Sequence, residues 1–118
     1  MKESADFLLT LLHAVTNTHL LHWTTKSYAE HQALGTFYEE LSDLVDGLAE
    51  TLMGKYGATP SFKGGYYAQA ANGKAELEEL KEYVETQRMK LPQDSEIQNE
   101  IDNIANLINK TLFLLRFP

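Results

Sequence analysis

Residues 97–115 read IQNEIDNIANLINKTLFLL, and apolar side chains recur in this stretch at steps of three and four. This spacing places them on one face of an α-helix, where a facing helix receives them as knobs in holes. Three more segments carry a helical period, so the sequence predicts helices over about 4–24, 27–54, 75–91 and 95–117. Ser4, Ser27 and Ser95 stand where N-caps are expected.

The predicted inner faces differ in composition from helix to helix. The first helix carries an apolar stripe, with His13 and Asn17 on the opposite, solvent side. The stripe consists of Leu8, Leu11, Leu12, Val15, His19, His22 and Trp23. The other three inner faces consist mainly of leucine, valine and isoleucine: Leu34, Tyr38, Leu41, Val45, Leu48 and Leu52, then Leu77, Leu80, Val84 and Leu91, then Ile97, Ile101, Ile104, Ile108, Leu112 and Leu115.

The connection over residues 55–74 is long, and it contains four glycines and several aromatic side chains. Most connections in compact domains have about 4–6 residues, but a bundle can use a longer one to carry the chain from one end to the other. The aromatic side chains are expected to pack on the bundle or on a neighbouring subunit. The sequence therefore predicts one all-α domain over 1–118, a ferritin-like four-helix bundle of two antiparallel hairpins joined by a long crossover.

The charge and the missing residue types exclude several classes of function. Without cysteine, the chain has no disulfides and no thiolate metal sites. The net charge of −7 disfavours DNA and anionic membranes as partners and favours cations. No apolar run reaches the roughly 20 residues that span a bilayer, and no leader segment is recognisable, so we expect a cytoplasmic protein. Residues 1–54 hold eight acidic residues, two lysines and all four histidines.

Imidazoles and carboxylates gather in this first hairpin. His19 and His22 lie one turn apart, His31 begins the second helix, and Asp46 and Glu50 project side by side four residues apart. Glu39 and Asp43 extend the same acidic stripe as accessory candidates. This donor set suits iron, zinc or manganese. Two simpler interpretations stay open: the histidines are hydrogen-bonded packing residues, and the acids, with Glu39 and Asp43, form a solvated helix edge. No histidine follows His31, so a metal site must come from this hairpin or from the first hairpins of two subunits.

The segments HLLHW (residues 19–23), YAEH (28–31) and DGLAE (46–50), with Tyr38 between them, resemble the Dps family of mini-ferritins. The resemblance implies a homo-oligomer of at least two copies that binds and oxidises Fe(II) between subunits. It implies the ligands His22, His31, Asp46 and Glu50, with accessory positions at His19 and Trp23. Many members have an aspartate where this chain has Gly35.

The sequence therefore supports three functions as hypotheses. The first is a Dps-like metal-binding protein that oxidises and sequesters Fe(II). The second is a non-catalytic ferritin-like structural or adaptor protein that has lost the site, because Gly35 replaces a ligand and the interval from His22 to His31 is short. A weaker similarity to short ferritin-like phage proteins places such a protein in an infected cell or a virion. The third, DNA association, is disfavoured by the charge and by the absence of a basic terminal run.

Overall fold

The computed structural model describes all residues, 1–118, and contains helices without β-strands. The elements are α1 (Lys2–Thr24), α2 (Tyr28–Tyr56), α3 (Gly73–Gln87), the short 3-10 turn η1 (Arg88–Lys90) and α4 (Ser95–Leu114). The predicted all-α class and its four helices are confirmed, with small shifts at the helix ends. None of the helices is long and apolar enough to cross a membrane.

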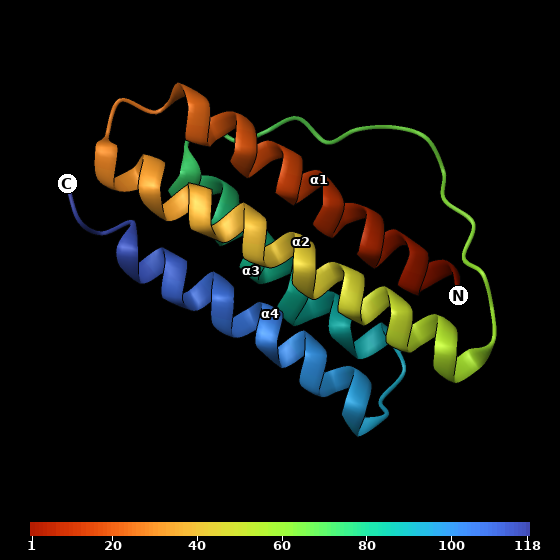
Figure 1. Ribbon diagram of the computed structural model, residues 1–118. Helices are drawn as coiled ribbons and strands as arrows, with labels where there is room; N and C mark the ends of the chain where they lie inside the picture. The colour runs from red at the N-terminus through yellow and green to blue at the C-terminus, as the bar shows by residue number, and fades with distance from the viewer.

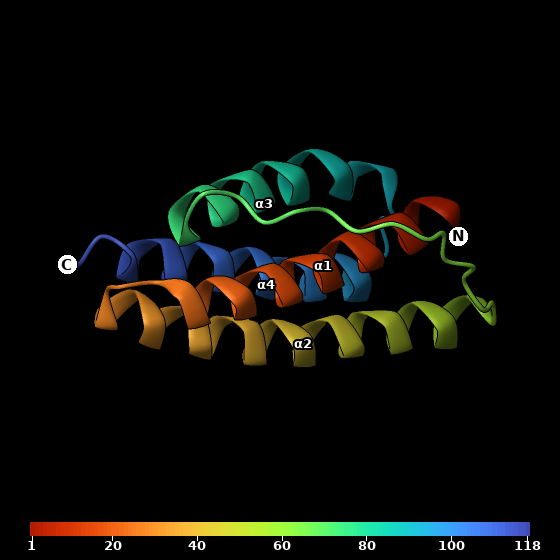
Figure 2. The same cartoon turned by 90° about the horizontal axis from the view of Figure 1, so that it is seen from above.

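The four helices form a ring in the spatial order α1, α2, α4, α3, so α2 and α3 follow each other in sequence but are not neighbours in the ring. α1 and α2 form an antiparallel hairpin, and α3 and α4 form a second one (Figure 1). α1 packs against α2 and α3, and α4 packs against the same two helices, so each helix is antiparallel to both of its neighbours. The crossover, residues 57–72, runs lengthwise past α1 and α3 (Figure 2). It carries the chain from one end of the bundle to the other, as the sequence predicts.

Leucine and isoleucine side chains fill the space between the helices. Phe7 and Phe37 are the largest fully buried side chains. Tyr38, Leu112 and Leu115 of the predicted faces are half-buried. The remaining predicted inner residues of the last three helices are buried: Leu34, Leu41, Val45, Leu48, Leu52, Leu77, Leu80, Val84, Leu91, Ile97, Ile101, Ile104 and Ile108.

The inner face predicted for α1 is wrong by about a quarter turn around the helix axis. The buried residues are Ser4, Ala5, Phe7, Leu8, Leu11, Ala14, Asn17, Thr18 and Leu21. Leu12 is 41% exposed and Trp23 is 65% exposed, so part of the predicted apolar stripe faces outward. The difference arises because the histidines and Trp23 lie beside the core rather than in it, whereas the face with Ala14 and Asn17 is covered by α3 and the crossover.

The helix ends confirm one predicted cap and correct two. The Ser27 hydroxyl accepts a hydrogen bond from the Glu30 amide at 3.2 Å, as an N-cap does. The Glu30 carboxylate accepts instead from the Thr25 hydroxyl and from the Gly73 amide, which joins the start of α2 to the start of α3. Ser4 is not a cap because α1 already begins at Lys2. Ser95 is not a cap either, because it is the first residue of α4 and Asp94 stands at the cap position.

A small ionic cluster fastens the end of α2 to the start of α4. Lys55 Nζ lies 3.0 Å from Glu96 Oε2 and 3.2 Å from Asp94 Oδ2. The Tyr56 hydroxyl also donates to Asp94. Hydrogen bonds from Tyr56 and Lys55 hold the pKa of Asp94 below its usual value. The backbone amide of Glu96 and the Lys55 ammonium do the same for the pKa of Glu96.

These lowered pKa values predict a stability that depends on pH. A carboxyl with a lowered folded-state pKa stabilises the fold above its unfolded pKa, and this contribution disappears as the pH falls through its folded pKa. We expect the free energy of unfolding to decline below about pH 5, and the decline to be shallower in Asp94→Asn. Urea titrations of both proteins at a series of acidic pH values measure the two slopes. Equal slopes would contradict the assigned role of Asp94.

Candidate functional site

Two histidines face each other across the α1–α2 hairpin near its loop. His22 Nδ1 lies 2.6 Å from the backbone oxygen of His31, and His31 Nδ1 lies 2.7 Å from the backbone oxygen of His22. The two rings stack with centroids 3.8 Å apart and planes 12° from parallel. We call this arrangement the histidine pair. It is reciprocal, so each imidazole is oriented by the other residue's backbone.

The hydrogen bonds fix the tautomer of both rings. A carbonyl oxygen only accepts, so each Nδ1 carries the proton and donates it. In the neutral imidazole each Nε2 then carries the lone pair, and it makes no hydrogen bond within the protein. Metal-binding histidines commonly donate one ring N–H to a carbonyl in this way and bind the metal through the other nitrogen. The histidine pair therefore presents two oriented nitrogen donors.

Gly35 packs directly against His22. A Cβ atom built at Gly35 would lie 2.9 Å from Cε1 and 3.1 Å from Nδ1 of the His22 ring, closer than real Cβ contacts. The ring occupies the space that a side chain at position 35 would need. A side chain at position 35 would therefore require the His22 ring to shift from the stacked position.

Three further aromatic side chains, from both α1 and α2, lie beside the pair. The His19 ring stacks on Tyr38 at 4.0 Å and lies 4.5 Å from Trp23. His22 meets the edge of Tyr38 at 5.5 Å. His19, His22 and His31 are half-buried while Trp23 is exposed. The predicted accessory residues His19 and Trp23 thus lie beside the pair, and Tyr38 joins them.

The structure does not bring the predicted carboxylates to the histidines of the same chain. Asp46 lies fifteen residues beyond His31 on one continuous helix, which separates them by about 22 Å. Asp46, Glu50, Glu39 and Asp43 are all exposed on the outer side of α2. No group of three or more histidine or acidic side chains within the chain could hold a metal ion. The predicted site between two subunits stays a prediction.

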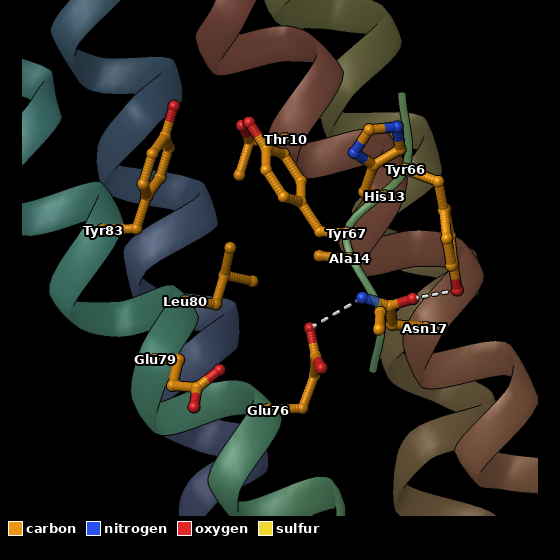
Figure 3. A pocket seen from close by; sticks show the side chains of 11 residues that line it. Thr10, His13, Ala14, Asn17, Tyr66, Tyr67, Glu76, Glu79, Leu80 and Tyr83 are labelled. Carbon is orange, nitrogen blue, oxygen red and sulfur yellow. Dashed lines mark hydrogen bonds between the residues drawn. The ribbon is translucent and has the colours of Figure 1, made fainter. Parts of the chain in front are cut away.

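A second site, missed by the sequence analysis, lies on the opposite side of α1. An open pocket of about 560 Å³ is lined by α1, the crossover and α3 (Figure 3). We call it the crossover pocket. His13 and Asn17, expected on the solvent side, line it instead: Asn17 is buried, and His13 is half-buried beneath Tyr66 and Tyr67.

Polar groups at the base of this pocket are linked to one another. The Tyr66 hydroxyl donates to Asn17 Oδ1, and Asn17 Nδ2 donates to Glu76 Oε2 at 3.3 Å (Figure 3). Glu76 Oε1 accepts from the Ala70 amide at 2.9 Å. On the opposite wall, burial raises the pKa of the Tyr83 phenol. The sequence signal for this site was the pair of polar residues four apart on α1 together with the tyrosines of the crossover.

The comparisons with known proteins assign no activity to either site. Residues 22–115 match the family of unknown function DUF5856, a range that includes the histidine pair. A relative in Enterobacteria phage T4, an uncharacterized 14.6 kDa protein of the mobD-ri intergenic region, is 38% identical over 61 residues. That alignment covers 50% of this chain and 48% of the relative, so the chain spans about half the length of the curated relative it matches. No solved structure matches the chain.

Proposed function

We propose that this protein is a metal-binding bundle whose site is shared between two copies. The chain belongs to the family of unknown function DUF5856. Its cargo in this proposal is Fe(II), with zinc or manganese as alternatives, and the bundle is ferritin-like in chain path. The observation that carries the proposal is the histidine pair, because both rings are oriented through Nδ1 and neither Nε2 has a hydrogen-bond partner within the protein. Imidazole nitrogen with carboxylate oxygen is a donor set for first-row metals.

The second copy is needed for the carboxylates. The midpoint between His31 and Asp46 falls between Tyr38 and Glu39 on α2. If two α2 helices pair antiparallel about a twofold axis beside that midpoint, His31 of each copy stands opposite Asp46 of the other. The acidic outer side of α2 then contributes oxygen donors to both sites. Glu50 extends the donor set by one turn, and Glu39 and Asp43 keep the local field negative.

Exposed apolar side chains near the histidine pair support association of this face. Trp23 is 65% exposed and Tyr28 is 75% exposed. Large apolar groups gathered on a surface are typical of a contact with another protein. The likeness to a phage protein fits a role of this kind inside an infected cell.

Iron binding and oxidation are tested together on the full chain. Apo-protein is titrated with Fe(II) without oxygen while the melting temperature is measured, and peroxide is then added while ferric absorbance is recorded. We expect a metal-dependent rise in melting temperature, because binding to the folded state alone stabilises it. The rise and the oxidation should vanish in His31→Ala and in the double variant Asp46→Ala, Glu50→Ala. Glu82→Ala, an exposed acid on α3, is the matched control and should behave as the parent.

Mixing the two inactive variants tests whether the site is shared. A mixed dimer restores one complete site, because one copy supplies the histidine and the other the carboxylates. Random pairing should therefore recover about one site in four relative to the parent. No recovery from folded, dimeric variants would overturn the shared site.

One observation favours a second candidate function. Three or more metal donors do not meet within the chain, and the stacked histidines satisfy each other's backbones. In a structural or adaptor bundle without metal chemistry, these hydrogen bonds that join α1 to α2 would be the whole role of the two histidines. This function predicts melting temperatures that do not respond to Fe(II), Zn²⁺ or Mn²⁺ in the parent protein.

A further inference from the structure

The crossover pocket has the size and composition of a small-molecule site. Its volume of about 560 Å³ lies within the range of roughly 300–1,000 Å³ usual for such sites. Its walls come from three separate parts of the chain, namely α1, the crossover and α3. The pocket lies apart from the histidine pair, so a ligand can occupy it whether or not the protein binds a metal.

A buried carboxylate without a basic partner lies at the base of the pocket. Glu76 is only 7% exposed, and its two hydrogen bonds come from the Asn17 amide and the Ala70 backbone, both neutral. Lys74, the nearest lysine in sequence, pairs with Glu78 at 3.8 Å instead. An ionised carboxylate has about four acceptor positions, so lone pairs of Glu76 remain available. Burial of a charge is unfavourable unless a counter-charge compensates it.

Aromatic rings surround the space above this carboxylate. Tyr66, Tyr67 and Tyr83 line the pocket together with His13, and we call these four rings the aromatic cage. His13 lies edge-on to Tyr67 at 4.9 Å and to Tyr66 at 5.5 Å. In Figure 3, Tyr83, Tyr67 and His13 stand in the upper part of the pocket and Tyr66 lies along its side, while the Glu76 carboxylate lies below them and points to Asn17. The π faces of aromatic rings attract cations, so the part of these faces that lines the pocket favours a positively charged ligand.

One further polar atom in the cage has no partner. His13 Nδ1 is buried and forms no hydrogen bond. An unpaired buried nitrogen is unfavourable, so a ligand that supplies the missing hydrogen bond stabilises the complex. The pocket also has Glu79 among its lining residues and no lysine or arginine. The charge at the pocket is therefore negative, which excludes phosphates and carboxylates as natural occupants.

We propose that the crossover pocket binds a small organic molecule through a primary alkylammonium group. The ammonium donates to the free lone pairs of Glu76 and contacts the π faces of the aromatic cage. The apolar remainder of the ligand packs on Leu80 and Ala14, which also line the pocket. A metal ion is a poorer occupant, because no three metal donors meet there.

Binding is measured by NMR titration of the full chain with putrescine and n-butylammonium at about 0.15 M salt, where general attraction to an acidic surface is screened. The neutral alcohol 1-butanol has a similar shape and no charge. We expect saturable shifts for both amines, confined to residues of α1, the crossover and α3, and none for 1-butanol. Equal binding of 1-butanol, or shifts elsewhere in the chain, would overturn the proposal.

Two variants measure separately how much the Glu76 charge and the aromatic cage contribute to amine affinity. Glu76→Gln should weaken amine binding by about tenfold or more, the usual effect of losing a charge-assisted hydrogen bond. Glu85→Gln makes the same change of charge at an exposed position of α3 and should leave affinity unchanged. Since Glu76 also holds the crossover through Ala70, Tyr67→Leu provides a variant that leaves those hydrogen bonds intact, and it too should lose affinity. Full affinity in both pocket variants would refute the site.

A free diamine and the lysine side chain of another protein both carry a primary alkylammonium group, so either one could be the source of the ligand. Titration with Nα-acetyl-lysine methylamide distinguishes them. Binding of putrescine alone assigns the site to small amines, which is the expected result. Binding of the lysine derivative alone, without putrescine, would contradict a small-molecule site.

Discussion

Replacing Phe37 with alanine is expected to lower the free energy of unfolding by about 3–5 kcal/mol, the usual range for a large core aromatic. Phe37 is fully buried on α2, within the cluster that all four helices share. The loss combines the transfer free energy of the ring with the cavity left behind, which rigid helix packing only partly closes. Small domains have about 5–15 kcal/mol of stability in total. This variant should therefore be partly unfolded at moderate urea concentrations.

Phe113→Ala is the matched control, because the same ring is removed from a side chain that is 52% exposed near the end of α4. Surface substitutions of this kind usually change stability by less than about 0.5 kcal/mol. Urea unfolding followed by circular dichroism compares both variants with the parent. Similar midpoints for the two variants would mean that the core is not centred on α2 as described.

Phe37 also illustrates how far the sequence determines the fold. The inner faces of the last three helices are predictable, since each is apolar on one side only. Phe37 escapes this prediction because it lies at the edge of the leucine stripe of α2. The inner face of α1 is harder to predict because this helix is covered on more than one side, by α2, α3 and the crossover. Polar Asn17 and Thr18 are buried there, and hydropathy alone cannot predict a buried residue that is satisfied by hydrogen bonds.

The sites are predictable to different degrees. Residue type and spacing identify His22 and His31, but their reciprocal hydrogen bonds depend on the close approach of α1 to α2 at Gly35. The crossover pocket could not be predicted from helical periods. Its walls include Tyr66 and Tyr67, which lie in a segment without regular structure, and their position is set by contacts far away in the sequence.

Replacing Gly35 with alanine is expected to break the histidine pair, and with it the metal response proposed for this protein. The new Cβ would lie 2.9 Å from Cε1 of His22, so the ring must move away. That movement removes the hydrogen bond from His22 Nδ1 to the His31 carbonyl and the stacking of the two rings. Overpacking of this kind usually destabilises by about 1–3 kcal/mol, and we expect this loss to exceed the gain of about 0.5–1 kcal/mol that alanine has over glycine in a helix. The measurements are urea unfolding and the NMR signals of the imidazole Nδ1–H protons, which should disappear or shift.

Gly47→Ala is the matched control, because Gly47 lies in the middle of the same helix. Its added Cβ would meet only Glu100 Oε2 at 3.9 Å, an ordinary contact. Alanine at a free helical position stabilises by about 0.5–1 kcal/mol relative to glycine. The two substitutions should therefore change stability in opposite directions, although both add one methyl group to α2. If Gly35→Ala instead stabilised the protein as Gly47→Ala does, His22 would have to be free to move, and the rigid orientation of its Nε2 would be wrong. A metal response that survived in such a variant would show that the ligands do not depend on the stacked arrangement.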